Sequence, residues 1–419
     1  MFGSYLTQWD LLVIVFYFVF QFSLGFIFKA FSKDASDYFR GGGSMLWWLV
    51  GASAFMTQFS AWTFTGAAGK AYVDGTLVMA IFFGNALGYF CNYLYTSYRY
   101  RRMRVVTAIE GVRDRFGPVN EQVFTWLQVP MSVVYAGIWL NGLGIVASSF
   151  FNVDPSFTVL IVGVVVVLMS VMGGSWAIVA SDFMQTLLLM SITLVACFLA
   201  LSHPAVDGLS GLLTKLPEGH LKPWDAEDAT FVYFWIFAAF VIQSFKLNNM
   251  FDAYRYLCVK DDKQARKASL MASILMFVGP FIWFIPPMAA RIIQPDLALV
   301  FPELGDKAYE GAFVFIGLEL MPLGMVGLLL CALFAATISS MDTGLNRNAG
   351  IIVKNFYQPV FRKNASPGHL LLAGKVISAL FGALIIVAAL GMQSIKEYDL
   401  FDIMILFGAS ITIPYAMPL

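Results

Sequence analysis

The sequence predicts an all-α membrane protein that crosses the bilayer many times and forms a single transmembrane domain over residues 1–419. Hydrophobic residues make up 59% of the chain and charged residues only 12%, whereas soluble domains carry about a quarter charged residues. Apolar stretches long enough to span a bilayer as helices recur along the chain. We therefore expect the lipid bilayer to be its main surroundings. The net charge of zero argues against a nucleic-acid partner.

Eleven apolar stretches are candidate membrane spans, about 20 residues each. They cover residues 10–29, 45–69, 76–97, 122–149, 157–173, 179–202, 230–250, 268–290, 322–346, 370–392 and 400–419. A shorter apolar piece at 312–320 is expected to be a half-helix or an outer-surface helix. The chain stops inside the last stretch, which suggests that the protein is truncated there.

The distribution of basic residues indicates the orientation, because Lys and Arg gather in cytoplasmic loops. If the N-terminus lies outside, 19 of the 26 basic residues fall on the inner side, six on the outer side, and Lys246 within a span. Lys29 and Lys33 follow the first apolar stretch instead of preceding it, so this stretch is a retained span and not a signal peptide. We expect a plasma or inner membrane protein whose N-terminus is outside.

The long loop at 203–229 divides the predicted spans into two sets. Residues 10–29 form an extra N-terminal helix, five spans cover 45–202, and five cover 230–419. This arrangement allows two five-helix repeats of opposite orientation, a plan that many transporters share.

The second span contains polar residues near its middle, among them Thr57, Gln58, Ser60 and Thr63. The stretch 45–69 is also long for a straight crossing. An unwound segment at about 56–60 would leave free carbonyls, which in lipid need a cation or water as a partner. The alternative is that the hydroxyls bond to their own helix or to a neighbour.

A second polar cluster lies in the ninth span. Ser339, Asp342 and Thr343 share one helical face, and Ser340 lies next to it. Hydroxyl and carboxylate oxygens are the ligands that hard cations such as sodium prefer. An ionisable group within a span indicates a functional site, although Asn346 and Arg347 follow and leave a solvated helix end as the alternative.

Two further ionisable residues lie in predicted spans. Asp182 is either a buried functional carboxylate or a helix N-terminal charge that faces the cytoplasm. Lys246 is the only basic residue in the body of span 230–250. It contacts the solute, pairs with a carboxylate, or extends along the helix toward the membrane surface.

Catalytic chemistry has no support in the sequence, so the chain is not expected to be an enzyme. It contains no phosphate-binding loop, and its three histidines fall outside the predicted spans. The four cysteines have no paired spacing typical of a disulfide framework or a zinc site. An ion gradient is then the natural source of energy, with sodium as the only metal.

Five ordered motifs resemble the sodium/solute symporter family, which includes sodium/galactose, sodium/proline and sodium/sialic acid symporters. The resemblance runs from about residue 10 to the end of the chain. The motifs are Asp37-Tyr-Phe-Arg-Gly-Gly-Gly43 with Trp47 and Trp48, the segment 107–117, Gly173-Gly174 with Asp182 and Gln185, Asn249 with Arg255, and Ser339-Ser340 with Leu345 and Asn346.

The resemblance implies a LeuT-type fold of two inverted five-helix repeats after one extra N-terminal helix. It also implies a sodium ion between core helices one and eight. The implied ligands are the carbonyls of Met56, Phe59 and Ala336 and the hydroxyls of Ser339 and Ser340. Some members bind a second ion, which would here lie near Asp182, Asp342 and Thr343.

The resemblance further implies a solute site on core helices one, two, three and six. Its residues would be Gln58, Ser60, Thr63, Phe82, Asn85, Tyr135, Trp139 and Asn249. Phe82 stands where sugar-type members have a glutamate, and span 122–149 lacks the arginine of sialic-acid-type members. We therefore expect a neutral polar solute.

The implied function is sodium-coupled import of a small polar organic solute by alternating access. Two alternatives remain open at this point: a transporter-like sensor domain of a signalling protein, and a sodium-leak or uncoupled permease.

Overall fold

The computed structural model describes residues 6–29, 35–151, 153–222, 229–250, 254–393, 400–407 and 410. Its described residues are almost entirely helical and form no strand, apart from one isolated bridge between Met45 and Val259. The predicted all-α class is therefore confirmed.

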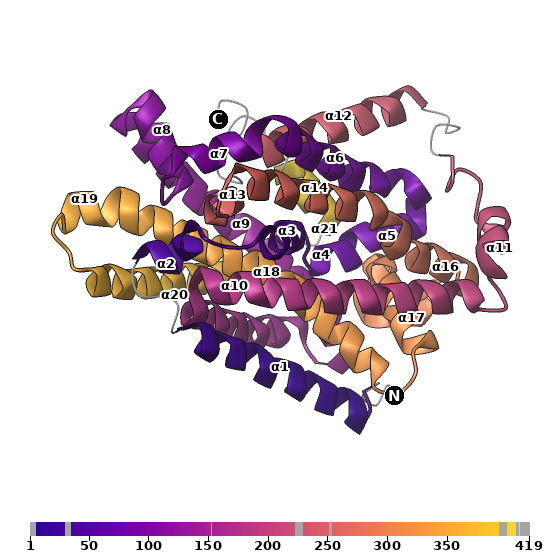
Figure 1. The fold of residues 1–419 in the computed structure, drawn as a ribbon. Helices are drawn as coiled ribbons and strands as arrows, with labels where there is room; N and C mark the ends of the chain where they lie inside the picture. The colour runs from indigo at the N-terminus through magenta and orange to yellow at the C-terminus, as the bar shows by residue number, and fades with distance from the viewer. Residues whose placement is uncertain are drawn as a thin grey trace.

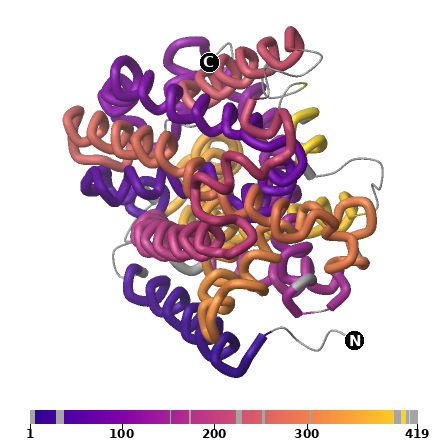
Figure 2. Tube along the Cα trace, turned by 90° about the vertical axis from the view of Figure 1, so that its right-hand side faces the viewer, coloured from indigo at the N-terminus to yellow at the C-terminus, as the bar shows by residue number. Residues whose placement is uncertain are grey.

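The first predicted span is helix α1 (Gln8–Lys29), which lies at the margin of the helix bundle (Figures 1 and 2). Its lipid-facing side exposes large apolar side chains such as Trp9 and Phe16. Its start is joined to helix α18 (Met325–Ile351), because the Asp10 carboxylate accepts a hydrogen bond from the Gly327 amide at 2.8 Å.

The second predicted span is broken into three helices: α3 (Trp47–Met56), α4 (Ala61–Phe64) and α5 (Gly66–Asp74). Residues 57–60 between α3 and α4 are not helical. The interruption predicted at about 56–60 is thus confirmed.

The other helices of the first half follow in order. They are α2 (Ala35–Arg40), which precedes α3, then α6 (Met79–Cys91), α7 (Ser97–Met103), α8 (Ala108–Phe116), α9 (Pro118–Phe151) and α10 (Pro155–Ser202). Gly174 interrupts α10 with φ 65° and ψ −178°, a conformation that L side chains rarely adopt. This kink separates the predicted spans 157–173 and 179–202.

The second half begins after the short helix α11 (Gly208–Lys215). It contains α12 (Ala229–Asn248), α13 (Tyr254–Cys258), α14 (Asp262–Val278), α15 (Pro280–Trp283), α16 (Ile285–Ile293), α17 (Ala312–Leu320), α18, α19 (Gln358–Phe361), α20 (Pro367–Met392) and α21 (Leu400–Phe407). The apolar piece at 312–320 is α17, a separate short helix before α18.

Among the residues that the structure describes, eight helices are long and apolar enough to cross a membrane, by length and composition, so the chain is a multi-pass membrane protein. Three of the eleven predicted spans differ. The stretch 45–69 is the broken segment, 157–173 is a shorter apolar helix (Pro155–Val171), and most of 400–419 lies outside the described residues. The division into repeats at 45–202 and 230–419 stays a prediction.

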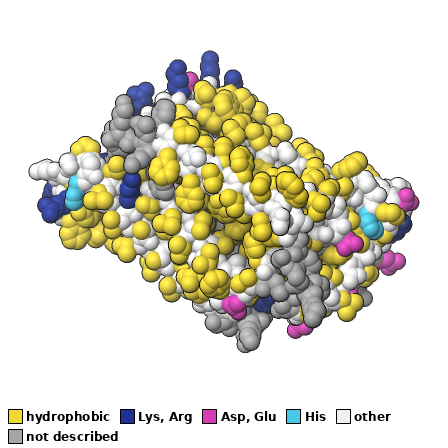
Figure 3. Space-filling view, turned by 90° about the horizontal axis from the view of Figure 1, so that it is seen from below, with side chains coloured by type: hydrophobic (Ala, Val, Ile, Leu, Met, Phe, Trp, Pro, Cys, Tyr) yellow, Lys and Arg dark blue, Asp and Glu magenta, His cyan; other side chains and the backbone are white. Residues whose placement is uncertain are grey.

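Helix α18 lies at the centre of the bundle and α1 at its edge. In their most apolar stretches 89% of the residues are buried in α18, against 22% in α1. Figure 1 shows α8 and α19 at one end of the molecule, and α11 and α17 at the other, where α1 begins. A broad apolar face lies between these ends (Figure 3), as expected for a surface in contact with lipid.

Helices α6 and α12 approach each other closely because α6 presents glycines to α12. A Cβ atom added at Gly84 would lie 2.9 Å from the Ala239 carbonyl oxygen, and one at Gly88 would lie 2.9 Å from Leu247 Cδ1. Small residues permit this close packing between membrane helices. Both helices line the cavity described below, so their spacing sets its width.

We expect Gly84→Val to lower the free energy of unfolding by about 1–3 kcal/mol, because the added atoms overpack the contact with α12. The measurement is thermal unfolding of the purified protein in detergent. Leu87→Val, on the lipid-facing side of the same helix, is the matched control, since Leu87 is 41% exposed. Equal melting temperatures for the two variants would contradict the close contact.

Candidate ion and solute sites

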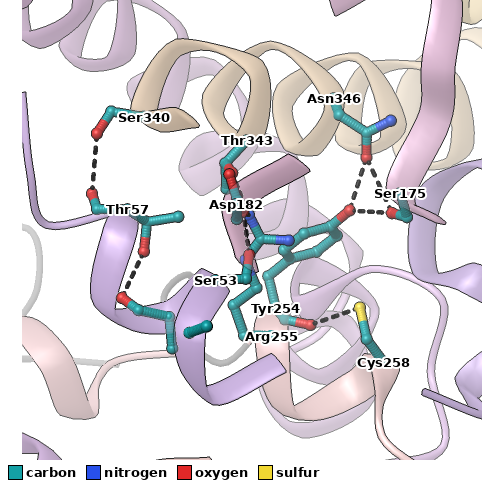
Figure 4. Close-up of polar contacts among 12 residues, drawn as sticks. Ser53, Thr57, Ser175, Asp182, Tyr254, Arg255, Cys258, Ser340, Thr343 and Asn346 are labelled. Carbon is teal, nitrogen blue, oxygen red and sulfur yellow. Dashed lines mark hydrogen bonds and ion pairs between the residues drawn. The ribbon is translucent and has the colours of Figure 1, made fainter. Parts of the chain in front are cut away.

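The unwound segment 57–60 packs against α18 through two of its polar side chains. The Ser340 hydroxyl donates to the carbonyl of Phe59 and lies 3.3 Å from the Thr57 carbonyl oxygen (Figure 4). The Thr337 hydroxyl accepts a hydrogen bond from the Ala61 amide at 2.8 Å, where α4 begins. Helix α18 therefore supplies hydrogen-bond partners to both sides of the break.

The five predicted sodium ligands all lie in the buried interior, and α18 carries three of them. They are Met56, Phe59, Ala336, Ser339 and Ser340. Within the described part of the chain, the Ser339 hydroxyl has no hydrogen-bond partner, although it lies near the Asp182 carboxyl group. The Met56 carbonyl accepts from the Phe59 amide at 2.9 Å. The Thr57 carbonyl also faces Ser340, but Thr57 was not among the predicted sodium ligands.

Asp182, in the middle of α10, forms a buried ion pair with Arg255 of α13. Its Oδ2 lies 3.2 Å from Arg255 Nη2, and the Ser53 hydroxyl donates to the same oxygen. The same Arg255 nitrogen donates to the Thr343 hydroxyl (Figure 4). Both charged side chains are almost fully buried, at 1% and 5% exposed. Asp182 is therefore an internal charge and not an exposed residue at a helix N-terminus.

The residues predicted for a second ion site are only partly brought together. Asp182 and Thr343 both contact the Arg255 guanidinium. Asp342 instead accepts a hydrogen bond from the Ser170 hydroxyl, and it borders a small cavity beside Gln21. A second ion bound by all three residues stays a prediction.

A second polar cluster joins four of the family-like motifs. The Tyr254 hydroxyl donates to the Phe39 carbonyl, and Ser175 Oγ lies 2.6 Å from the same carbonyl oxygen. Asn346 Oδ1 lies 2.6 Å from the Tyr254 hydroxyl oxygen, and the Asn346 amide donates to the Tyr38 carbonyl at 3.2 Å. These contacts hold residues 38–39 against α10, α13 and α18.

Two cavities meet beside the unwound segment. We call the first the central cavity; it lies between α4, α6, α9, α12 and α21, with about 1180 Å³ of empty space, open solvent included. The second, the inner cavity, has about 1170 Å³ of empty space by the same measure and continues toward Arg255 and Arg347. Residues common to both are Thr57, Gln58, Tyr135, Trp139 and Lys246.

Most of the predicted solute residues line the central cavity: Gln58, Ser60, Phe82, Asn85, Tyr135 and Trp139. Asn249 lines only the inner cavity, where its amide donates to the Lys246 carbonyl at 2.6 Å. Thr63 is buried and is not among the residues that line either cavity.

The structure adds several cavity residues to the predicted solute site. They are Trp62, Ile81, Trp235, Gln243 and Lys246, together with Met404 and Ile405 of α21. The sequence carries a signal for two of them, because Gln243 and Lys246 are three residues apart and so share a helix face. Lys246 Nζ lies 5.8 Å from the centre of the Tyr135 ring, inside the protein.

Three comparisons with known proteins agree on the class of this chain. The model of the sodium:solute symporter family matches residues 38–414. The sodium/sialic acid symporter SiaT of Proteus mirabilis is 25% identical over 388 residues, which cover 90% of this chain and 77% of SiaT. Sodium/myo-inositol cotransporter 2 of Oryctolagus cuniculus is 26% identical over 416 residues, which cover 88% of this chain and 59% of that protein.

Solved structures support the fold. A Na⁺-coupled sialic acid symporter, in a substrate-bound outward-open state, superposes with a TM-score of 0.80 at 20% identity, covering 93% of this chain and 83% of that one. The nucleobase-cation-symport-1 transporter Mhp1 superposes with a TM-score of 0.54 at 16% identity, covering 90% of this chain and 78% of that one. This likeness confirms the LeuT-type fold that the sequence predicts.

The relatives named above are symporters or cotransporters, so they lend no support to a sensor or to an uncoupled permease. The family model covers most of the chain, including the broken span and the Ser339-Ser340 motif. On this evidence the chain belongs to the sodium:solute symporter family and is a membrane transporter, not an enzyme.

Proposed function

We propose that this protein imports a small polar organic solute together with sodium, and that sodium binds between the unwound segment 57–60 and α18. One observation carries the proposal: the Ser340 hydroxyl contacts the carbonyls of Thr57 and Phe59 at the break between α3 and α4. The relatives SiaT and myo-inositol cotransporter 2 are sodium-coupled by name.

The oxygen atoms at this break have the chemistry that a hard cation needs. Carbonyl and hydroxyl oxygens are suitable ligands for sodium, which prefers oxygen as other hard cations do. The Ser340 hydroxyl presents its lone pairs to sodium when it rotates away from the Phe59 carbonyl. The Ser339 hydroxyl, which lies near the Asp182 carboxyl group, supplies a further oxygen.

The same segment links the ion to the solute. Gln58 and Ser60 line the central cavity, while the carbonyls of Thr57 and Phe59 face Ser340. Sodium that holds the segment against α18 also fixes the two cavity side chains. Coupling then follows from a difference in affinity between conformations, because each ligand favours the arrangement that the other binds.

The direction of import rests on the predicted orientation, in which the basic ends of α7 and α8 are cytoplasmic. Alternating access requires the central cavity to open in turn to each side. The inner cavity, which contains Arg255 and Arg347, is then the route to the cytoplasm.

We expect the double variant Ser339→Ala/Ser340→Ala to lose most of its stabilisation by sodium. Ligand binding to the folded state stabilises it by about 2.7 kcal/mol at a hundredfold excess over Kd. The measurement is the melting temperature of the purified protein across a sodium titration, with potassium as the reference salt, and it requires no knowledge of the solute.

Ser269→Ala is the matched control for this experiment. Ser269 is also buried on a membrane helix, but its hydroxyl bonds its own helix at the Ala265 carbonyl, 3.1 Å away. Wild-type sodium stabilisation in the double variant would show that the proposed site is wrong.

The orientation is tested with single cysteines in a variant that lacks the four native ones. We expect a membrane-impermeant maleimide to label Lys215→Cys, on outer helix α11, in intact cells. Lys363→Cys, in the loop between α19 and α20, is expected to react only after permeabilisation. The reverse pattern would place the N-terminus inside.

A further inference from the structure

Basic side chains line the solute pathway beside the unwound segment, and one of them, Arg255, is paired with the buried Asp182 carboxylate. Lys246 lines both the central and the inner cavity, and Arg255 and Arg347 line the inner cavity. No Asp or Glu is found among the described residues that line either cavity. Charges of one sign in a cleft with low-dielectric walls concentrate ligands of the opposite sign.

Lys246 is placed to contact a ligand in the central cavity. It is on α12, its ammonium group lies 5.8 Å from the centre of the Tyr135 ring on α9, and both residues border the two cavities. A lysine that extends toward the membrane surface would not line both cavities. Its place in the lining of both cavities favours contact with a ligand over that alternative.

Two buried amide oxygens of the central cavity accept no hydrogen bond from the described residues. Asn85 is 5% exposed, and its Oδ1 accepts no hydrogen bond from the described residues. Gln243 Oε1 is buried and unpartnered in the same way. Both side chains line this cavity. A buried acceptor without a partner is unfavourable, so a ligand that donates hydroxyl hydrogens is favoured here.

The remaining wall of the central cavity is largely aromatic. Trp62, Phe82, Trp139 and Trp235 line it together with Tyr135. Aromatic faces pack against the C–H groups of a small organic molecule while a few polar groups fix its orientation. The cavity thus combines one cation, several amides and apolar walls.

We propose that the solute is a hydroxylated organic monocarboxylate, whose carboxylate is bound by Lys246 and whose hydroxyl groups are bound by Asn85 and Gln243. This inference rests on the proposed function and identifies the substrate class of the same site. It replaces the neutral solute expected from the sequence, because Lys246, whose role the sequence analysis left open, lines the central cavity.

A negative charge on the solute also strengthens its coupling to sodium. Thr57 faces the Ser340 hydroxyl with its carbonyl and borders both cavities, as Lys246 does. Sodium at the break and the Lys246 ammonium group repel each other across this segment. An anion bound between them relieves the repulsion, so that sodium and solute each raise the affinity of the other.

The test compares carboxylates with their own uncharged amides, using the purified full-length chain. D-glucuronate is paired with D-glucuronamide, and lactate with lactamide, with binding read from the melting temperature in sodium and in potassium. We expect at least one acid to bind at least tenfold more tightly than its amide in sodium. Lys246→Met is expected to abolish this difference, and Lys246→Arg to retain it.

Lys267→Met is the matched control. Lys267 also lies over an aromatic ring, with Nζ 5.9 Å from the centre of the Trp47 ring. It is outside both cavities, so its variant is expected to keep the acid preference.

The outcomes separate this inference from the proposed function. Sodium-dependent binding of an amide as tight as that of its acid, an acid preference that survives in Lys246→Met, or the absence of binding by any acid would each overturn the monocarboxylate. The proposed function fails on a different result, namely sodium stabilisation of the solute-free protein that is unaffected by Ser339→Ala/Ser340→Ala.

Discussion

The structure depends on satisfying the backbone where a membrane helix is interrupted. Residues 57–60 leave the helical path inside an apolar bundle, and free carbonyls there are unfavourable by several kcal/mol each. Helix α18 resolves this with the Thr337 and Ser340 hydroxyls, which contact the two sides of the break. This requirement is consistent with the central, deeply buried position of α18.

A second constraint is the charge buried between α10 and α13. The Arg255 guanidinium contacts Asp182 and Thr343, two of the three residues for which the family resemblance implies an ion. A buried ion pair contributes little net stability, but removal of one partner leaves an uncompensated charge that destabilises by about 3–5 kcal/mol. In this conformation the Arg255 guanidinium satisfies the Asp182 carboxylate.

The sequence was informative where a polar group interrupts an apolar pattern, because lipid tolerates few exceptions. That principle identified the break at 56–60 and the serines of α18. The cavity residues on α6 and α9 came instead from the family resemblance. The sequence was less informative about which neighbouring helix each polar side chain contacts. Asp342 and Thr343 are adjacent in sequence, yet one contacts Ser170 of α10 and the other Arg255 of α13. Thr63 is likewise buried away from the cavities. Which neighbour a polar side chain meets is set by helix crossings, which sequence spacing does not specify.

Lys246 shows how one position changes the interpretation of an entire cavity. The residues that α6 and α9 contribute to the cavity, such as Phe82 and Tyr135, are uncharged and largely aromatic. Helix α12 packs close to α6 because Gly84 and Gly88 allow it, and Lys246 lines the same cavity as those aromatic residues. The cation lies over the Tyr135 ring, whose electron-rich face stabilises it when no solute is bound. An arriving carboxylate therefore meets a positive charge that is already positioned, on the helix that opposes α9.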